Sequence, residues 1–169
     1  AQQGGGICVD GVVVMEGSEI SGNSSTSDGG GAWIEGHGDH VGSAEALYLY
    51  DSVLSSNEAS GSGGGVYNDA SILLMDRVVV EDNQAGSYGG AVLCEGQFLD
   101  PNWGTFDVCH MYVDDTVFRR NSGSSGGAIW SDYWDGTFHN VWFVENQATY
   151  YGGGFRVGRG VIFPTPTYE

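Results

Sequence analysis

Five acidic side chains recur at one position of a repeat and form the clearest candidate for chemistry in the sequence. Each follows an apolar residue by three positions; the five are Asp10, Glu35, Asp69, Glu95 and Asp132. If the repeats stack in register, neighbouring carboxylates lie about 5 Å apart, and like charges at that spacing are destabilising unless something compensates them. Two interpretations remain open and are compatible. Each acid ends a strand and accepts hydrogen bonds from turn N–H groups, or hard cations such as Ca²⁺ bridge adjacent carboxylates.

Other charged positions follow the same repeat. Asp76 and Asp114, each seven residues before a recurrent asparagine, are expected to be neighbours without a cation between them, which makes them a second metal candidate. Arg77 is expected between Asp51 and Asp115 on adjacent coils. The pair Glu81–Asp82 is expected beside Arg119–Arg120, and such pairs help to fix the register.

An aromatic set occupies the position directly after the apolar residue. Its members Trp33, Tyr67 and Trp130 alternate with inward residues, so strand geometry points them outward. An exposed apolar stripe indicates a covering loop, a protein partner or a platform for glycans. All three interpretations remain open.

Two loop motifs suggest further chemistry. Cys94 and Cys109 bracket an insertion, and a disulfide between them would suit a secreted protein, with Cys8 left over. The segment His37-Gly-Asp39-His40 offers ligands for a transition metal, but two histidines on a loop are weak evidence and an exposed polar loop is the preferred interpretation.

A repeated frame has to position all these residues. A Gly-Gly-Gly/Ala-apolar motif ends at Ile7, Ala32, Val66, Val92, Ile129 and Phe155. Asparagines follow at Asn23, Asn57, Asn83, Asn121 and Asn146, and the next apolar residue comes 9, 9, 9, 8 and 9 residues later. Repeats this regular indicate a solenoid. The asparagines are expected to form a stacked turn ladder, because Asn tolerates left-handed geometry and its amide bonds turn backbone.

The residues between these landmarks alternate as strands do. Positions three, eight and ten before each asparagine are almost all apolar, as in Leu54, Leu49 and Leu47, and no stretch has a helical period. The prediction is an all-β, single-stranded parallel β-helix of about six coils, with three short strands per coil and insertions in coils two and four. It forms one domain over 1–169, open at both ends. The expected coils are 1–23, 24–57, 58–83, 84–121, 122–146 and 147–169.

Two of these motifs resemble a known family. Gly-Gly-Ala-Val at 89–92 and Phe-Arg-Arg-Asn at 118–121, with their counterparts at 126–129 and 143–146, resemble the GGA[ILV] and FxxN repeats of polymorphic outer-membrane-protein passengers, which are autotransporter surface proteins. The resemblance covers roughly residues 4 to 157. It implies a right-handed parallel β-helix and a function that is adhesive or structural.

Composition limits the partners. The 22 acidic and 5 basic residues give a net charge of −17, which argues against nucleic acid and anionic membranes, whose recognition rests on Lys and Arg. No signal peptide or membrane span is seen, as expected if a targeting segment has been removed, and we expect an extracellular location. A carbohydrate-binding or polysaccharide-processing β-helix is the alternative function. Few basic residues are present to support a polysaccharide lyase, whereas the many acidic residues leave a glycosidase open.

The two ends of the sequence fall in the middle of a coil. The 14 residues after Phe155 and the 7 residues up to Ile7 together nearly complete one coil. Open solenoid ends leave strand edges unpaired. The expected partners are therefore copies of the same chain stacked head to tail, or further coils of a longer chain. Surface glycans are a second expected partner.

Overall fold

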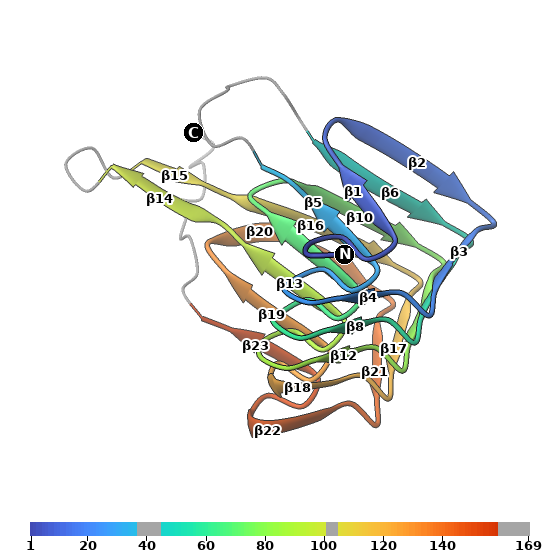
Figure 1. Ribbon diagram of the computed structural model, residues 1–169. Coiled ribbons are helices and arrows are strands. Elements are labelled where there is room, and N and C mark those ends of the chain that lie inside the picture. The colour runs from blue at the N-terminus through green and yellow to red at the C-terminus, as the bar shows by residue number, and fades with distance from the viewer. Residues whose placement is uncertain (37–44, 101–104, 159–169) are drawn as a thin grey trace, which may run out of the picture.

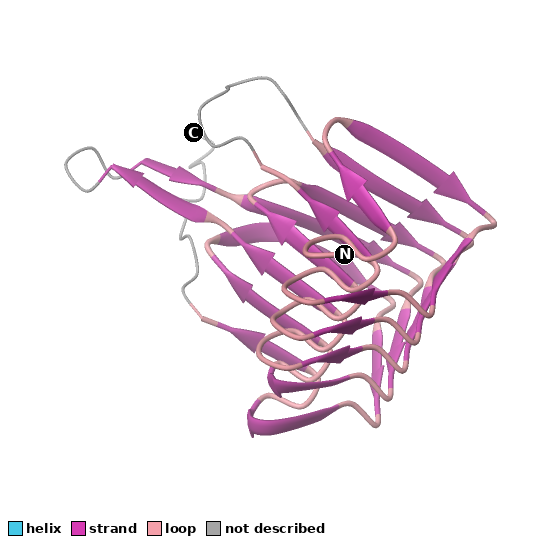
Figure 2. Ribbon diagram, in the orientation of Figure 1, coloured by secondary structure: helices cyan, strands magenta, loops and turns pink. Residues whose placement is uncertain are grey.

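The computed structural model describes residues 1–36, 45–100 and 105–158 (Figure 1). Every regular element in these ranges is a β-strand (Figure 2). Among the described residues there is accordingly no helix long and apolar enough to cross a membrane. The His37-Gly-Asp39-His40 motif lies outside the described residues.

Four parallel sheets stack their strands in chain order, as in a parallel β-solenoid (Figure 1). We call one passage of the chain through the four sheets a coil. Sheet 1 contains β1 (Ile7–Val9), β5 (Ala32–Ile34), β9 (Val66–Asp69), β13 (Val92–Glu95), β19 (Ile129–Asp132) and β23 (Phe155–Val157). Sheet 2 contains β2 (Val12–Glu16), β6 (Ala46–Tyr50), β10 (Ile72–Asp76), β16 (Cys109–Asp114) and β20 (Trp134–His139).

The other two sheets follow the turn after sheet 2. Sheet 3 contains β3 (Glu19–Ser21), β7 (Val53–Ser55), β11 (Val79–Glu81), β17 (Val117–Arg119) and β21 (Trp142–Val144). Sheet 4 contains β4 (Ser24–Ser25), β8 (Glu58–Ala59), β12 (Gln84–Ala85), β18 (Ser122–Ser125) and β22 (Gln147–Tyr151). The expectation of three strands per coil is wrong, because a fourth strand follows each asparagine. Its commonest length is two residues, too short for alternation to reveal it.

The apolar columns pair in the expected register. Ile7 pairs with Ala32 and Val66 with Val92 in sheet 1, while Leu73 pairs with Leu47 and Met111 in sheet 2. Sheet 3 aligns the residues three before each asparagine, namely Ile20, Leu54, Val80, Phe118 and Phe143. The middle members of all three columns are fully buried and form one core. Since alternate residues of a strand face opposite sides, this register also sets which side chains face solvent.

Glycine is required where the motif turns the chain into sheet 1. Gly89 has φ of 61°, in the left-handed region that glycine adopts without steric cost. A Cβ on the next residue, Gly90, would lie 2.1 Å from the Gly127 carbonyl oxygen of the following coil. Successive coils therefore approach more closely at this corner than any side chain would allow.

The insertion between β13 and β16 forms a hairpin. Strands β14 (Gln97–Asp100) and β15 (Thr105–Asp107) pair antiparallel and project away from the sheets (Figure 1). At its base the structure joins Cys94 and Cys109 in a disulfide, with Cα atoms 5.7 Å apart, as the sequence predicted. Both cysteines are fully buried, and Cys8 is a free, exposed thiol.

The core changes character in the last described coil. Four inward-facing columns end, among the described residues, in the aromatic side chains of Trp134, Phe138, Phe143 and Phe155. Phe155 lies 5.5 Å from Trp134 and 5.2 Å from Phe138 between ring centroids. These large rings pack on one another at this end of the core but stay partly exposed.

Candidate functional site

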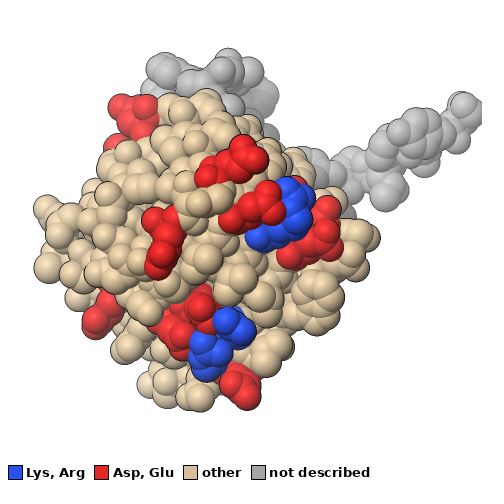
Figure 3. All heavy atoms as spheres, turned by 90° about the vertical axis from the view of Figure 1, so that its right-hand side faces the viewer, with Lys and Arg blue, Asp and Glu red and all other residues tan. Residues whose placement is uncertain are grey.

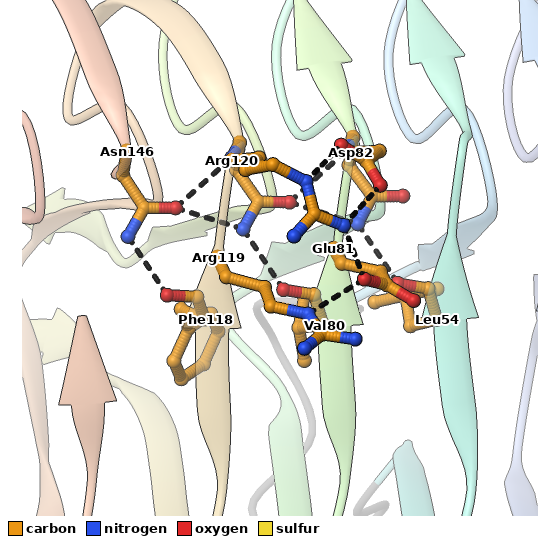
Figure 4. A network of polar contacts seen from close by, with 10 residues as sticks. Leu54, Val80, Glu81, Asp82, Phe118, Arg119, Arg120 and Asn146 are labelled. Atoms are coloured by element: carbon orange, nitrogen blue, oxygen red, sulfur yellow. Dashed lines mark hydrogen bonds and ion pairs between the residues drawn. The ribbon is translucent and has the colours of Figure 1, made fainter. Parts of the chain in front are cut away.

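The five asparagines form a continuous hydrogen-bonded ladder in the turn between sheets 3 and 4. Figure 4 shows the part of the ladder that ends at Asn146. The Asn83 Nδ2 group donates to Asn121 Oδ1 at 3.0 Å and to the Leu54 carbonyl at 2.9 Å. The Asn83 backbone N–H donates to the same Asn121 oxygen at 3.0 Å. Asn57, Asn83 and Asn121 are at most 1% exposed, so the ladder satisfies polar groups that would be costly to bury unpaired.

The ladder has a direction. Every side-chain amide oxygen from Asn57 onward accepts two N–H groups from the asparagine of the preceding coil. At the first coil, the Asn23 Oδ1 atom has no such donor among the described residues, and at the last coil the Asn146 N–H has no such acceptor there. One end of the ladder therefore presents acceptors and the other presents donors.

Backbone hydrogen bonds at two neighbouring turn positions run in the same direction as the asparagine ladder, from the N–H of one coil to the next coil. The N–H of Arg77 donates to the Asp114 carbonyl of the next coil, and the N–H of Asp115 donates to His139. A second column runs from Asp82 to Arg119 and from Arg120 to Val144. Continuing each pattern, the N–H groups of Asn140 and Glu145 point beyond the last described coil. The Glu16 and Ser21 carbonyls occupy the acceptor positions at the first coil.

The acidic column is brought together over part of its length. Glu95 pairs with Asp69 on one side and Asp132 on the other. The pairing of β1 with β5 ends at Val9 and Ile34, one residue before Asp10 and Glu35. The Glu95 carboxylate accepts a hydrogen bond from the Tyr67 hydroxyl at 2.7 Å. Burial of the phenol, and then this bond to a carboxylate, raise the pKa of Tyr67 well above its usual range.

The aromatic column also stacks in register but is largely covered. Trp33 and Tyr67 stack with ring centroids 4.4 Å apart, and Trp33 is only 9% exposed. Trp130 is half-buried and stacks on Tyr88, which comes from the turn after sheet 4. Because its members pack on one another and on a neighbouring turn, the column presents little open ring surface for a glycan.

Three arginines, Arg77, Arg119 and Arg120, bind acidic partners. Figure 3 shows two groups of basic side chains, each flanked by acidic side chains. Arg119 and Arg120 bind Glu81 at 2.7 and 2.6 Å, as the sequence predicted (Figure 4). The Arg119 hydrogen bond is the main reason why the pKa of Glu81 is lowered.

Arg77 was expected to bridge Asp51 and Asp115, but it binds Asp51 at 2.6 Å and its own neighbour Asp76 at 2.6 Å. The expectation is wrong for Asp115, because the guanidinium turns back along its own coil. Asp115 instead accepts a hydrogen bond from Asn140 at 2.9 Å.

The second metal candidate, Asp76 and Asp114, has basic side chains beside it that the sequence did not predict. Asp76 and Asp114 pair in register, but each has a basic side chain as its partner. Asp76 is held by Arg77, and Asp114 accepts from His139 Nδ1 at 2.7 Å. In the described part of the chain, one group of three residues places its ligand atoms within 4.8 Å of one another: Asp114, Asp115 and His139, all exposed.

Sequence reasoning missed a groove on the outer face of sheet 2. It has a volume of about 290 Å³ and is lined by Tyr50, Asp76, Tyr112, Asp114, Thr137 and His139, together with the apolar residues Leu74, Met75 and Val113. The repeat frame contained the signal, since these residues stand seven or nine positions before each asparagine. They pair across strands β6, β10, β16 and β20.

Comparison with known proteins gives no relative. No protein-family model, no curated protein and no solved structure matches this chain.

Proposed function

We propose that this chain is an extracellular structural or adhesive protein, a right-handed parallel β-helix of about six coils that assembles head to tail into a filament. The single observation that carries the proposal is the polarity of the asparagine ladder. Stacking the acceptor end of one copy on the donor end of another would give the Asn146 N–H groups the oxygen of Asn23 from the second copy. The Asn23 amide would then reach the Phe143 carbonyl, as Asn146 reaches Phe118 within the chain.

The edges of the sheets support the same contact. Within the described residues, β1–β4 are the outermost strands at one end of the four sheets and β20–β23 at the other. Parallel strands that continue a parallel sheet must keep their direction, so the contact joins two different surfaces. A contact of that kind leaves a free surface at each end of the pair and propagates into a filament.

The apolar surface is distributed in the same way. The hydrophobic residues that are only partly buried against the core all lie at the two ends of the described stack. They are Ile7, Val13 and Met15 at one end and Trp134, Phe138, Val141 and Phe155 at the other. Stacking two copies would cover both sets, and burial of apolar area is the main favourable term in association.

Cations are the second part of the proposal. Asp69, Glu95 and Asp132 are register partners on adjacent strands, and carboxylate oxygens are the ligands that Ca²⁺ takes, several at a time and in flexible geometry. Calcium should raise the melting temperature, by an amount equivalent to about 2.7 kcal/mol at one hundred times its dissociation constant. Glu95→Gln should abolish the rise while keeping an acceptor for Tyr67. An unchanged melting temperature in calcium would contradict this part.

An adhesive or surface location is supported by two further features. A buried disulfide is typical of oxidising compartments. The likeness of the Gly-Gly-Ala and Phe-x-x-Asn motifs to passenger repeats of surface proteins points the same way.

The assembly is tested by blocking each end separately. Sedimentation velocity over a concentration series should show the average mass of the wild-type protein rising with concentration and with salt, which screens repulsion between acidic copies. A bulky polyethylene glycol maleimide on exposed Cys8 blocks the first coil. Asn146→Asp replaces the ladder donor by a carboxylate at the last coil. Each blocked protein alone should stay a monomer.

The mixture gives the sharper result. An equimolar mixture of the two blocked proteins should form dimers and stop there, because one free surface of each kind remains. Gln84→Glu is the matched control, since it adds the same charge next to a ladder asparagine in a middle coil and should leave assembly intact. Wild-type protein that remains monomeric at high concentration, with or without calcium, would overturn the proposal.

A further inference from the structure

The groove on the outer face of sheet 2 is built from two rows of side chains. One row crosses the strands as Tyr50, Asp76, Asp114 and His139. The next row contains Leu74, Tyr112 and Thr137. Since parallel strands are about 4.8 Å apart, four strands make this surface about 14 Å long. The groove is an elongated, shallow depression that offers tyrosine rings beside carboxylates, a hydroxyl and an imidazole.

These groups are held in place by neighbours. The Tyr112 ring, which is 38% exposed, lies parallel to the His110 ring with centroids 6.5 Å apart. His110 is itself fixed by Asp135 on the adjacent strand. Arg77 holds Asp76, and His139 holds Asp114. Because the strands and these contacts restrict rotation, little conformational entropy remains to be lost when a ligand binds.

The charges of the groove favour a neutral ligand. Asp76 already has a guanidinium partner, so a cationic ligand would have to displace Arg77. An anionic ligand would meet two carboxylates on a chain whose net charge is −17. Hydroxyl groups, by contrast, can donate to the free lone pairs of Asp76 and Asp114 without breaking either ion pair. Beside them, the tyrosine faces offer apolar surface to C–H groups.

We propose that this groove binds a short, neutral oligosaccharide, with one sugar ring stacked on Tyr112 and its hydroxyl groups donating to Asp76 and Asp114. Because the lining residues extend across four neighbouring strands, the groove suits a chain of sugar rings lying across the strands rather than a single compact molecule. The site differs from the aromatic column at Trp33, Tyr67 and Trp130, which lies on sheet 1. It is independent of the proposed filament, because it lies on the side of the solenoid.

Titration followed by NMR tests the groove. Protein blocked at Cys8 is titrated with neutral tetrasaccharides of glucose, mannose, galactose and N-acetylglucosamine. At least one should shift amide signals on β10, β16 and β20, with a dissociation constant on the order of 1 mM, as for a shallow site. Tyr112→Ala should weaken binding about tenfold, the loss of one stacked aromatic contact, while Tyr112→Phe should retain it.

Tyr48→Ala is the matched control, since Tyr48 lies on the same face of sheet 2, pairs with Leu74 and does not line the groove. It should leave the dissociation constant unchanged. The proposal is overturned if none of the four sugars binds, or if Tyr48→Ala weakens binding as much as Tyr112→Ala. It is also overturned if EDTA abolishes sugar binding and Zn²⁺ restores it, which would assign the groove to a metal at Asp114, Asp115 and His139.

Discussion

The middle coils and the last described coil carry the same motif in different surroundings. Asn83 has a coil on each side and is completely buried, whereas Asn146 has a described coil on only one side and is partly exposed. In the column beside them, Phe118 is 0% exposed and Phe143, stacked on it at 5.3 Å, is 37% exposed. Burial and a second set of partners come from the neighbouring coil, so the contribution of a repeat residue to stability depends on its place in the stack.

The largest expected loss of stability comes from removing an asparagine in the middle of the ladder, compared with removing the last one. Asn83→Ala removes the acceptor for two Asn57 N–H groups and the donors to Asn121 and Leu54, all buried. It should lower the free energy of unfolding by about 4 kcal/mol, because each buried unsatisfied group costs about 1 to 3 kcal/mol. Asn146→Ala should cost about 1 to 2 kcal/mol, since water reaches the groups it exposes. Urea denaturation measures both, and equal losses would contradict the comparison.

The next largest effect is expected from the disulfide at the base of the insertion between β13 and β16. The Cys94–Cys109 disulfide closes a loop with a sequence separation of 15. Replacing both cysteines by Ala should lower the free energy of unfolding by about 3 kcal/mol, mainly through greater freedom of the unfolded chain. Urea denaturation of the double variant is compared with the oxidised wild-type protein, and Cys8→Ala serves as the control. A loss no larger than that of the control would show that the insertion needs no covalent restraint.

A smaller effect is expected at the surface of the same coils. Glu81→Gln removes the charge that holds Arg119 and Arg120, but water screens these pairs. The loss should be about 0.5 kcal/mol at low salt and should fall further in 1 M NaCl. Thermal melts at the two salt concentrations measure it. A salt-independent loss would indicate that packing of the side chain, rather than charge, is responsible.

The smallest expected effect is the pH dependence of stability that His139 and Glu81 cause. The two residues change stability with pH in opposite directions. The hydrogen bond to Asp114 raises the pKa of His139 above its ordinary value of 6.5. The contribution of His139 to stability is therefore fully present below pH 6.5 and is lost as the pH rises through the raised pKa. The pKa of Glu81 is lowered from 4.5, so its contribution is present above pH 4.5 and is lost as the pH falls through the lowered value.

These signs are measured by comparing unfolding of the wild-type protein with His139→Gln and Glu81→Gln from pH 3 to 9 at roughly one-unit intervals. The difference for His139→Gln should shrink at high pH and that for Glu81→Gln at low pH. Differences that stay constant across the range would show that neither ion pair is linked to folding.

Most of the fold followed from counting along the sequence. The distance from each asparagine to the next apolar residue predicted the parallel register, and with it the acid and aromatic columns. Counting failed for the fourth strand, because a segment such as Gln84–Ala85 is too short to alternate. The repeat spacing also did not predict both partners of Arg77. Its guanidinium is on a flexible side chain and binds the nearby acids Asp51 and Asp76.

The candidate sites were less predictable for a related reason. A column places side chains next to one another but does not determine how much of each is covered. Trp33 and Tyr67 occupy the predicted positions yet bury one another, whereas Tyr112, which was not singled out, faces an open groove. Exposure depends on all the elements that pack around a position, which no single repeat specifies.

The sequence by itself determined the solenoid register and the partners of the asparagine ladder, because both depend on spacing that repeats along the chain. Only the tertiary structure decided that the ladder has a donor end and an acceptor end, that aromatic rings fill the last described coil and that sheet 2 carries a groove. Hydrogen-bond direction and solvent exposure are properties of stacked coils rather than of one repeat.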